Sequence, residues 1–265
     1  MVDIHHHLLP DLDDGSTSLA VSLDMARMAV ADGITHVVCT PHASNHWAFE
    51  PERIMASFAE LSSALDRENI PLTLGLGCDF HLSSDNVDDA FRNPTKYTIN
   101  GKQYLLVELP DVLLQGGTGE TLHNLRVSGI VPILTHPERN LTLQKNTDRL
   151  AAWMRDGLLV QITAGSVLGK MGRDAERTAH QLLADHWVHF LATDAHNTTS
   201  RPPQMRKAHE LIAKKYGAEY AEALTIHNPA AVFSGKALPQ LEPPLHLFDD
   251  EDEDEPKRPL WRRLL

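Results

Sequence analysis

Histidine and carboxylate side chains recur in short groups along this sequence, and six of these groups directly follow a segment of apolar or β-branched residues. The six groups are His5-His6-His7, Thr40-Pro41-His42, Cys78-Asp79-Phe80-His81, Glu108-Leu109-Pro110, Thr135-His136-Pro137-Glu138-Arg139 and Thr193-Asp194-Ala195-His196. Ionisable side chains at the ends of buried strands are costly unless something compensates them, and divalent cations are the simplest compensation. Nitrogen and oxygen ligands without a thiolate suit manganese, iron or zinc. Each group alone has a structural explanation, such as a helix N-cap or a rim ion pair, but their common position predicts a metal centre.

The elements that would position these groups alternate between strands and helices. Strands are expected at 3–7, 34–40, 71–80, 130–136, 158–163 and 188–196, with a hairpin over 96–109 that turns at Asn100-Gly101. Helices are expected over 18–33, near 118–128, 145–156 and 173–185, and from Pro51 and Pro202 onward. About seven strands alternating with helices imply parallel pairing; a closed or nearly closed barrel fits this length best, and a doubly wound open sheet is the alternative. In both folds the carboxyl ends of the strands share one edge, where the six groups would converge.

Strand geometry separates ligands from bystanders. Residues i and i+2 project to the same side of a strand, so His5 and His7 can bind one ion while His6 faces away. Asp194 and His196 have the same spacing.

A further carboxylate follows the turn at Pro10, where either Asp13 or Asp14 could fold back over the site. The candidate ligands then number about nine, too many for a single ion. We therefore expect a cluster of two or three ions.

Charge and hydropathy exclude several classes of protein. The 265 residues carry a formal net charge of −12, which argues against nucleic acid as the main partner. With 42% hydrophobic residues the chain can bury a substantial core, yet no apolar run is long enough to span a membrane. The first residues show no basic and apolar leader, so we expect a cytoplasmic protein.

The two cysteines, Cys39 and Cys78, form no CxxC pattern and are expected to be buried free thiols. A cysteine-nucleophile phosphatase needs Cys-x5-Arg, but Asn45 and Ser84 occupy the arginine positions. That chemistry is excluded.

The chain ends differ in character. Residues 1–240 are expected to form a single domain, and 241–265 an acidic, disordered tail that contains the acidic run 249–255.

The ordered motifs resemble those of the polymerase and histidinol phosphatase (PHP) superfamily of metal-dependent phosphoesterases. The segments "DIHHHLLPDLDDG", "CTPH", "GCDF", "VELP", "THPERN", "TDAHNTTSRPP" and "IHNPAAV" are more similar still to one branch, the manganese-dependent protein-tyrosine phosphatases of bacterial capsule and exopolysaccharide gene clusters. The resemblance covers residues 2 to about 235. It implies a single-domain α/β fold, a distorted (β/α)7 TIM-like barrel, with a trinuclear site that holds manganese.

The resemblance also implies an assignment of ligands. One ion would take His5, His7, Asp79 and Asp194, a second Asp79, Glu108 and His136, and a third Asp14, His42 and His196. Arg139 and Arg201 match arginines that hold the substrate phosphate. Asp79 departs from the family pattern, which has a longer glutamate there, so bridging two ions needs a local shift.

The activity implied is hydrolysis of a phosphotyrosine ester by a hydroxide that bridges the ions, with His42 or an aspartate near the third ion as candidate acid for the leaving group. The implied partner is the phosphotyrosine tail of a membrane-associated bacterial tyrosine autokinase. Competing hypotheses are a phosphatase for a small metabolite such as histidinol phosphate, a degenerate metal-binding regulatory module, and a PHP phosphodiesterase, which the acidic body disfavours.

Overall fold

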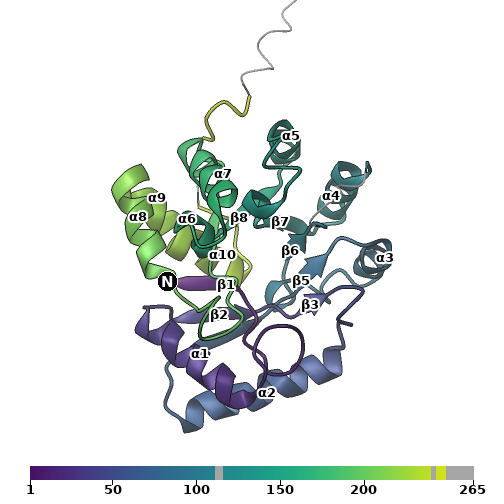
Figure 1. Cartoon of the computed structure of the whole chain (residues 1–265). Helices are drawn as coiled ribbons and strands as arrows, with labels where there is room; N and C mark the ends of the chain where they lie inside the picture. The colour runs from purple at the N-terminus through teal and green to yellow at the C-terminus, as the bar shows by residue number, and fades with distance from the viewer. Residues whose placement is uncertain (111–115, 240–242, 249–265) are drawn as a thin grey trace, which may run out of the picture.

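The computed structural model of the chain describes residues 1–110, 116–239 and 243–248, in which strands and helices alternate (Figure 1). The strands are β1 (Val2–His6), β2 (His36–Cys39), β3 (His42–Ala43), β4 (Thr73–Leu76), β5 (Asp79–His81), β6 (Tyr104–Glu108), β7 (Val131–Thr135), β8 (Leu159–Thr163) and β9 (Phe190–Ala192). The helices are α1 (Leu19–Ala31), α2 (Pro51–Arg67), α3 (Ser84–Arg92), α4 (Thr118–Val127), α5 (Asp148–Arg155), α6 (Ala164–Val167), α7 (Arg173–Ala184), α8 (Arg206–Tyr216), α9 (Ala218–Glu222) and α10 (Asn228–Ser234), with short helical turns η1 (Ile99–Gly101), η2 (Pro137–Arg139) and η3 (Ala223–His227).

All strand pairs in the described part of the chain are parallel, as the alternation predicts. One sheet has the order β1-β2-β4 and the other β3-β5-β6-β7-β8-β9. Only two residues separate β2 from β3, and two separate β4 from β5, so the chain passes from one sheet to the other twice. A bridge between His6 and Ala195 then joins β1 to the segment after β9. The strands therefore form a barrel-like arrangement, with helices around the outside (Figure 1).

The two faces of the strands bury different apolar clusters. In β6, Leu105 and Val107 belong to the larger cluster, which includes residues of the surrounding helices, such as Leu122 in α4. The intervening Leu106 belongs to a smaller cluster with Ile4 and residues of the other strands. This alternation is the period-2 pattern of a strand that is buried on both faces.

An irregularity in β1 determines where its histidines point. The register with β2 shifts between Asp3 and His6. Ile4 joins the smaller apolar cluster, and yet the next residue, His5, contacts Gln161 on β8. In a regular strand, neighbouring residues point to opposite faces. The bulge therefore allows the candidate ligand His5 to lie on the same face of β1 as Ile4.

The predicted hairpin at Asn100-Gly101 is wrong. Asn100 lies in the helical turn η1 with φ of 52°, and the strand begins only at Tyr104. The Asn100 side chain accepts a hydrogen bond from Leu76 N at 2.9 Å and donates one to Phe233 O at 2.8 Å. The Asn100-Gly101 turn thus connects its own segment to β4 and α10 by hydrogen bonds, and it does not join two strands of a hairpin.

Residues 243–248, which fall in the predicted tail, contact the body. Leu245 N donates to Asp185 O at 2.9 Å, and Trp187 Nε1 donates to Leu245 O at 2.9 Å. Residues 249–265, with the acidic run, lie outside the described residues. No helix in the described ranges combines the length and the apolar character needed to cross a membrane.

Candidate metal centre

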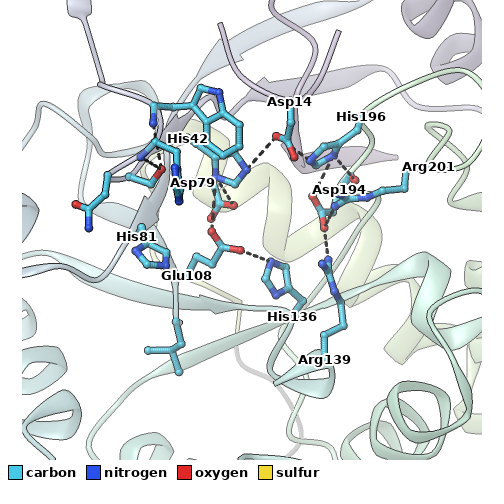
Figure 2. A pocket seen from close by; sticks show the side chains of 15 residues that line it. Asp14, His42, Asp79, His81, Glu108, His136, Arg139, Asp194, His196 and Arg201 are labelled. Atoms are coloured by element: carbon cyan, nitrogen blue, oxygen red, sulfur yellow. Dashed lines mark hydrogen bonds and ion pairs between the residues drawn. The ribbon is translucent and has the colours of Figure 1, made fainter. Parts of the chain in front are cut away.

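A cavity of about 400 Å³ opens at the carboxyl ends of the strands (Figure 2). Its lining includes Asp14, His42, Asp79, Glu108, His136, Arg139, Asp194, His196 and Arg201. Figure 2 shows these side chains directed toward a common hollow, with both arginines directed at Asp194. The structure thus brings together residues that are up to about 190 positions apart in the sequence, as expected from the strand ends.

The nine residues predicted as ligands form four overlapping groups. Within each group the ligand atoms lie within 4.8 Å of one another. The groups are His7, Asp14, His42 and His196; His5, Asp79 and His136; His5, His7 and Asp194; and His42, Asp79 and Glu108. Because the groups share His5, His7, His42 and Asp79, they are parts of one cluster.

Asp79 lies between two of these groups despite its short side chain. Its Oδ2 atom is 3.3 Å from His5 Nε2 and 3.4 Å from His42 Nδ1. An aspartate at this position therefore reaches the ligand nitrogens of both β1 and β3.

Gln161 and Asp13 contact the Nδ1 atoms of two of the ligand histidines, His5 and His7. The side-chain oxygen of Gln161 accepts a hydrogen bond from His5 Nδ1 at 2.9 Å, which directs the lone pair of Nε2 into the cluster. Asp13 Oδ2 contacts His7 Nδ1 at 2.8 Å and accepts from His42 N at 3.0 Å. Asp14 is the carboxylate of this pair that faces the cavity, 3.3 Å from His42 Nε2.

Gln161 was not identified from the sequence. The available signal is one amide in the otherwise apolar segment "LLVQIT". His6 was expected to be a bystander, and it belongs to none of the four groups. Its ring is buried and forms no hydrogen bond to any described residue, and burial lowers its pKa to about 3.

Asp194 connects the histidines to the arginines. Its Oδ1 atom lies 3.5 Å from both His5 Nε2 and His7 Nε2. Its Oδ2 atom accepts hydrogen bonds from Arg139 Nη1, at 2.5 Å, and from Arg201 Nη2. Asp194 itself has φ of 51°, a left-handed conformation that is uncommon outside glycine and turns the chain away directly after β9.

Local turns bring the two arginines to this carboxylate. Arg139 ends η2, the short turn that follows His136, and Arg139 N donates to His136 O at 2.9 Å. Arg201 closes a loop in which Asn197 Oδ1 accepts hydrogen bonds from the backbone of residues 199–201. His196 N donates to Arg201 O at 3.0 Å, which completes the loop.

Burial and neighbouring charges shift the pKa values of several side chains in the cluster. Burial and the charge of Asp79 raise the pKa of Glu108 to about 8. Burial alone would lower the pKa of His5, but the carboxylates of Asp79 and Asp194 raise it to about 8. Burial and the charge of Arg139 lower the pKa of His136 to about 3. Protons therefore occupy part of the cluster near neutral pH, and cations would displace them.

The donor set fits divalent cations. Asp79 Oδ1 and His42 Nδ1 are buried and have no hydrogen-bond partner among the described residues. Buried polar atoms without a partner are rare, and both of these face a cluster of imidazole and carboxylate ligands. Such a mixture suits manganese, iron or zinc and leaves several oxygens for bridging.

The chain is similar to known proteins over most of its length. Residues 1–234 match the model of the family described as capsular polysaccharide synthesis, CpsB/CapC. The tyrosine-protein phosphatase YwqE of Bacillus subtilis (strain 168) is 31% identical over 226 residues, which are 85% of this chain and 89% of YwqE. The tyrosine-protein phosphatase CpsB of Streptococcus pneumoniae is 29% identical over 244 residues, 90% of this chain and 100% of CpsB.

The fold has a solved counterpart at similar identity. A crystal structure from work on YwqE of B. subtilis and CpsB of S. pneumoniae, described there as unique metal-dependent tyrosine phosphatases, superimposes with a TM-score of 0.87 at 30% identity. The superposition covers 92% of this chain and 98% of the other.

Proposed function

The chain belongs to the CpsB/CapC family of capsular polysaccharide synthesis, and from this premise we propose that it is a metal-dependent protein-tyrosine phosphatase. The observation that carries the proposal is the cluster of nine imidazole and carboxylate ligands beside two arginines, on the floor of a cavity. The relatives named as tyrosine-protein phosphatases and the metal-dependent tyrosine phosphatases of similar structure support it.

We assign three ion positions to the cluster. By the family resemblance, His5, His7, Asp79 and Asp194 would hold one ion, Asp79, Glu108 and His136 a second, and Asp14, His42 and His196 a third. The four groups of neighbouring ligand atoms contain the same nine residues but divide them differently. Manganese is the metal we propose, because the sequence motifs resemble those of manganese-dependent phosphatases; the mixture of imidazole and carboxylate ligands fits manganese and equally suits iron or zinc. When bound, the ions would supply Lewis-acid charge to the phosphate oxygens and lower the pKa of a coordinated water.

The two arginines would bind the phosphate. Their guanidinium groups are forked donors that match phosphate oxygens, and both reach the cavity from one side. Both also donate to Asp194 Oδ2, so this carboxylate positions them beside the ligand cluster. Their positive charge would stabilise the negative charge that develops on the transferred group.

The candidate we keep for protonation of the leaving oxygen is His42, in a state in which it does not bind the third ion; Asp14 is poorly suited, because hydrogen bonds from His196 and His42 hold the pKa of its carboxyl well below the usual range. Both line the cavity, and their side chains lie 3.3 Å apart. A group in this position would hold a proton at the edge of the cluster, next to the solvent-exposed side of the cavity.

The physiological substrate we propose is the phosphotyrosine tail of a membrane-associated bacterial tyrosine kinase that acts in capsule synthesis, and the proposed location is the cytoplasm. The capsular polysaccharide family and the relatives' names support this assignment. We also propose that the two sheets constitute one distorted (β/α)7 barrel, in which β2 with β3 and β4 with β5 each count as one strand.

The test measures hydrolysis of a phosphotyrosine peptide and of histidinol phosphate before chelation, after chelation and after return of Mn²⁺. We expect peptide turnover to disappear on chelation and to return with Mn²⁺, while far-UV circular dichroism stays unchanged, because the buried apolar clusters do not depend on the ions. Full activity of the chelated protein refutes the metal centre. A kcat/KM that favours histidinol phosphate refutes the tyrosine-phosphatase assignment but keeps a phosphomonoesterase.

A further inference from the structure

Trp47 lies at the wall of the metal-centre cavity, and no step proposed above uses it. It belongs to the loop after β3, and its side chain is half-buried. Its indole stacks on the imidazole of His42, with ring centroids 5.2 Å apart and planes inclined by 19°. His42 in turn lies 3.3 Å from Asp14 and 3.4 Å from Asp79. The indole therefore stacks directly on a member of the ligand cluster.

The loop holds Trp47 in a fixed position. Ser44 Oγ accepts hydrogen bonds from His46 N at 3.2 Å and from Trp47 N at 3.3 Å. Ser44 N donates to Trp47 O at 2.9 Å, so hydrogen bonds run both from Ser44 to Trp47 and from Trp47 to Ser44. A side chain on a closed turn loses little conformational entropy when a ligand packs against it.

Among the described residues, the floor of the cavity is polar, and this turn supplies its one large apolar ring. The floor carries buried carboxylates such as Asp79 and Asp194, which cannot contact an uncharged ring favourably. Among the residues that line the cavity, Trp47 is the one with a large apolar ring. An indole face prefers to contact another aromatic ring, in a stacked or edge-on arrangement.

We propose that Trp47 is a specificity-determining residue that contacts the aryl ring of the phosphorylated side chain and favours phosphotyrosine over phosphoserine. This inference rests on the proposed phosphatase function. With its phosphate at the ligand cluster, a phosphotyrosine would carry its ring farther out in the cavity, where Trp47 lines the wall. A phosphoserine has no ring to reach that wall.

The decisive experiment separates binding from turnover. Phenylphosphonate and methylphosphonate, which are not hydrolysed, are compared as competitive inhibitors of the Mn²⁺-loaded wild type and of Trp47→Ala. We expect Trp47→Ala to raise the Ki of phenylphosphonate about two- to twelvefold, the strength of one aromatic pair, and to leave the Ki of methylphosphonate unchanged. Trp47→Phe should restore most of the affinity for phenylphosphonate.

Phe49→Leu is the matched control. Phe49 lies in the same loop, but its ring contacts Tyr97, at a centroid distance of 4.9 Å, and it does not line the cavity. We expect no change in the ratio of the two Ki values in this variant. A parallel measurement of Mn²⁺ affinity in Trp47→Ala reports whether His42 still binds metal.

Equal weakening of both inhibitors, or a lowered Mn²⁺ affinity with an unchanged Ki ratio, would overturn the inference, because Trp47 would then only support His42. An unchanged Ki for phenylphosphonate would also overturn it. If the wild type hydrolyses no phosphotyrosine peptide with Mn²⁺, the proposed function itself fails. That result is independent of the Trp47 variants.

Discussion

Replacement of Gln161 by leucine isolates the contribution of a residue that touches no substrate. The Gln161 side-chain oxygen lies 2.9 Å from His5 Nδ1, and both residues are 0% exposed. This contact keeps the proton of a neutral His5 on Nδ1, so that Nε2 presents a lone pair to the cluster. Leucine has nearly the same bulk but offers no acceptor.

The size of the effect follows from the alternative tautomer. In the variant, metal-free His5 would carry its proton on Nε2, where Asp79 and Asp194 accept it at 3.3 and 3.5 Å. Binding an ion at Nε2 moves the proton back to Nδ1 and leaves a buried N–H without a partner, at a cost of about 1–3 kcal/mol. With about 1.4 kcal/mol per factor of ten, the affinity for Mn²⁺ should fall about 5- to 150-fold. Loss of the outer partner of a metal-binding histidine generally has an effect of this size.

The assay is calorimetric titration of metal-free protein with Mn²⁺ in the presence of a competing chelator. It is performed at pH 9, above the pKa of about 8 that the carboxylates give His5, so that the ring is neutral at the start. Gln103→Leu is the control, because the Gln103 amide donates to Gly235 O at 3.1 Å and does not line the cavity. Unchanged affinity in a folded Gln161→Leu protein, or an equal loss in both variants, would refute the tautomer argument.

Two further predictions concern the arginines and the protons of the cluster. Arg139→Ala should lower kcat on a phosphotyrosine peptide by about 10²- to 10³-fold, as loss of one donor to a developing charge does, while bound metal per chain is retained; lost metal with normal turnover per bound ion would contradict the phosphate-binding role. Mn²⁺ affinity should rise with pH through pH 8, since the proton of Glu108, whose pKa burial raises to about 8, must leave before an ion binds, and so must the proton of His5, whose pKa the carboxylates raise to about 8. Between pH 6.5 and 8.5 the His5 proton alone should change the apparent affinity about 25-fold, measured by the same titration; a pH-independent affinity would show that neither side chain is a ligand.

Much of the site could be predicted because strand ends converge. His5, Glu108, His136 and Asp194 are far apart in the sequence. Each lies at the carboxyl end of a buried strand or just after it, and parallel strands end at one edge. The residues that form hydrogen bonds to the ligand side chains, without being ligands themselves, were harder to identify. Gln161 is a neutral amide in mid-strand, and its contact with His5 depends on a bulge in β1 that no local pattern predicts.

The fold was predictable where the hydrophobic periodicity of strands and helices is strong. It was mispredicted where one sequence motif, the Asn-Gly dipeptide, is compatible with two different structures. The alternation of apolar strands and amphipathic helices gave the parallel pairing. The Asn100-Gly101 dipeptide predicts a tight turn, and a turn is present, but tertiary hydrogen bonds to Leu76 and Phe233 determine what the turn connects. Such contacts span up to 133 positions and lie beyond any local window.

The pairing of β1 with the segment around β9 determines when, during synthesis of the chain, the ligand cluster can be complete. Asp3 accepts a hydrogen bond from Thr193 N at 3.0 Å, across 190 positions, and Asp194 N donates to His5 O close by. A ribosome that adds about 5–20 residues per second needs about 10–40 s to produce the second partner after the first. During that interval the nascent chain carries His5 and His7 without Asp194 and His196, so a complete cluster cannot form. We therefore expect that the complete set of ions is bound only after β9 and the segment that follows it have emerged and have paired with β1.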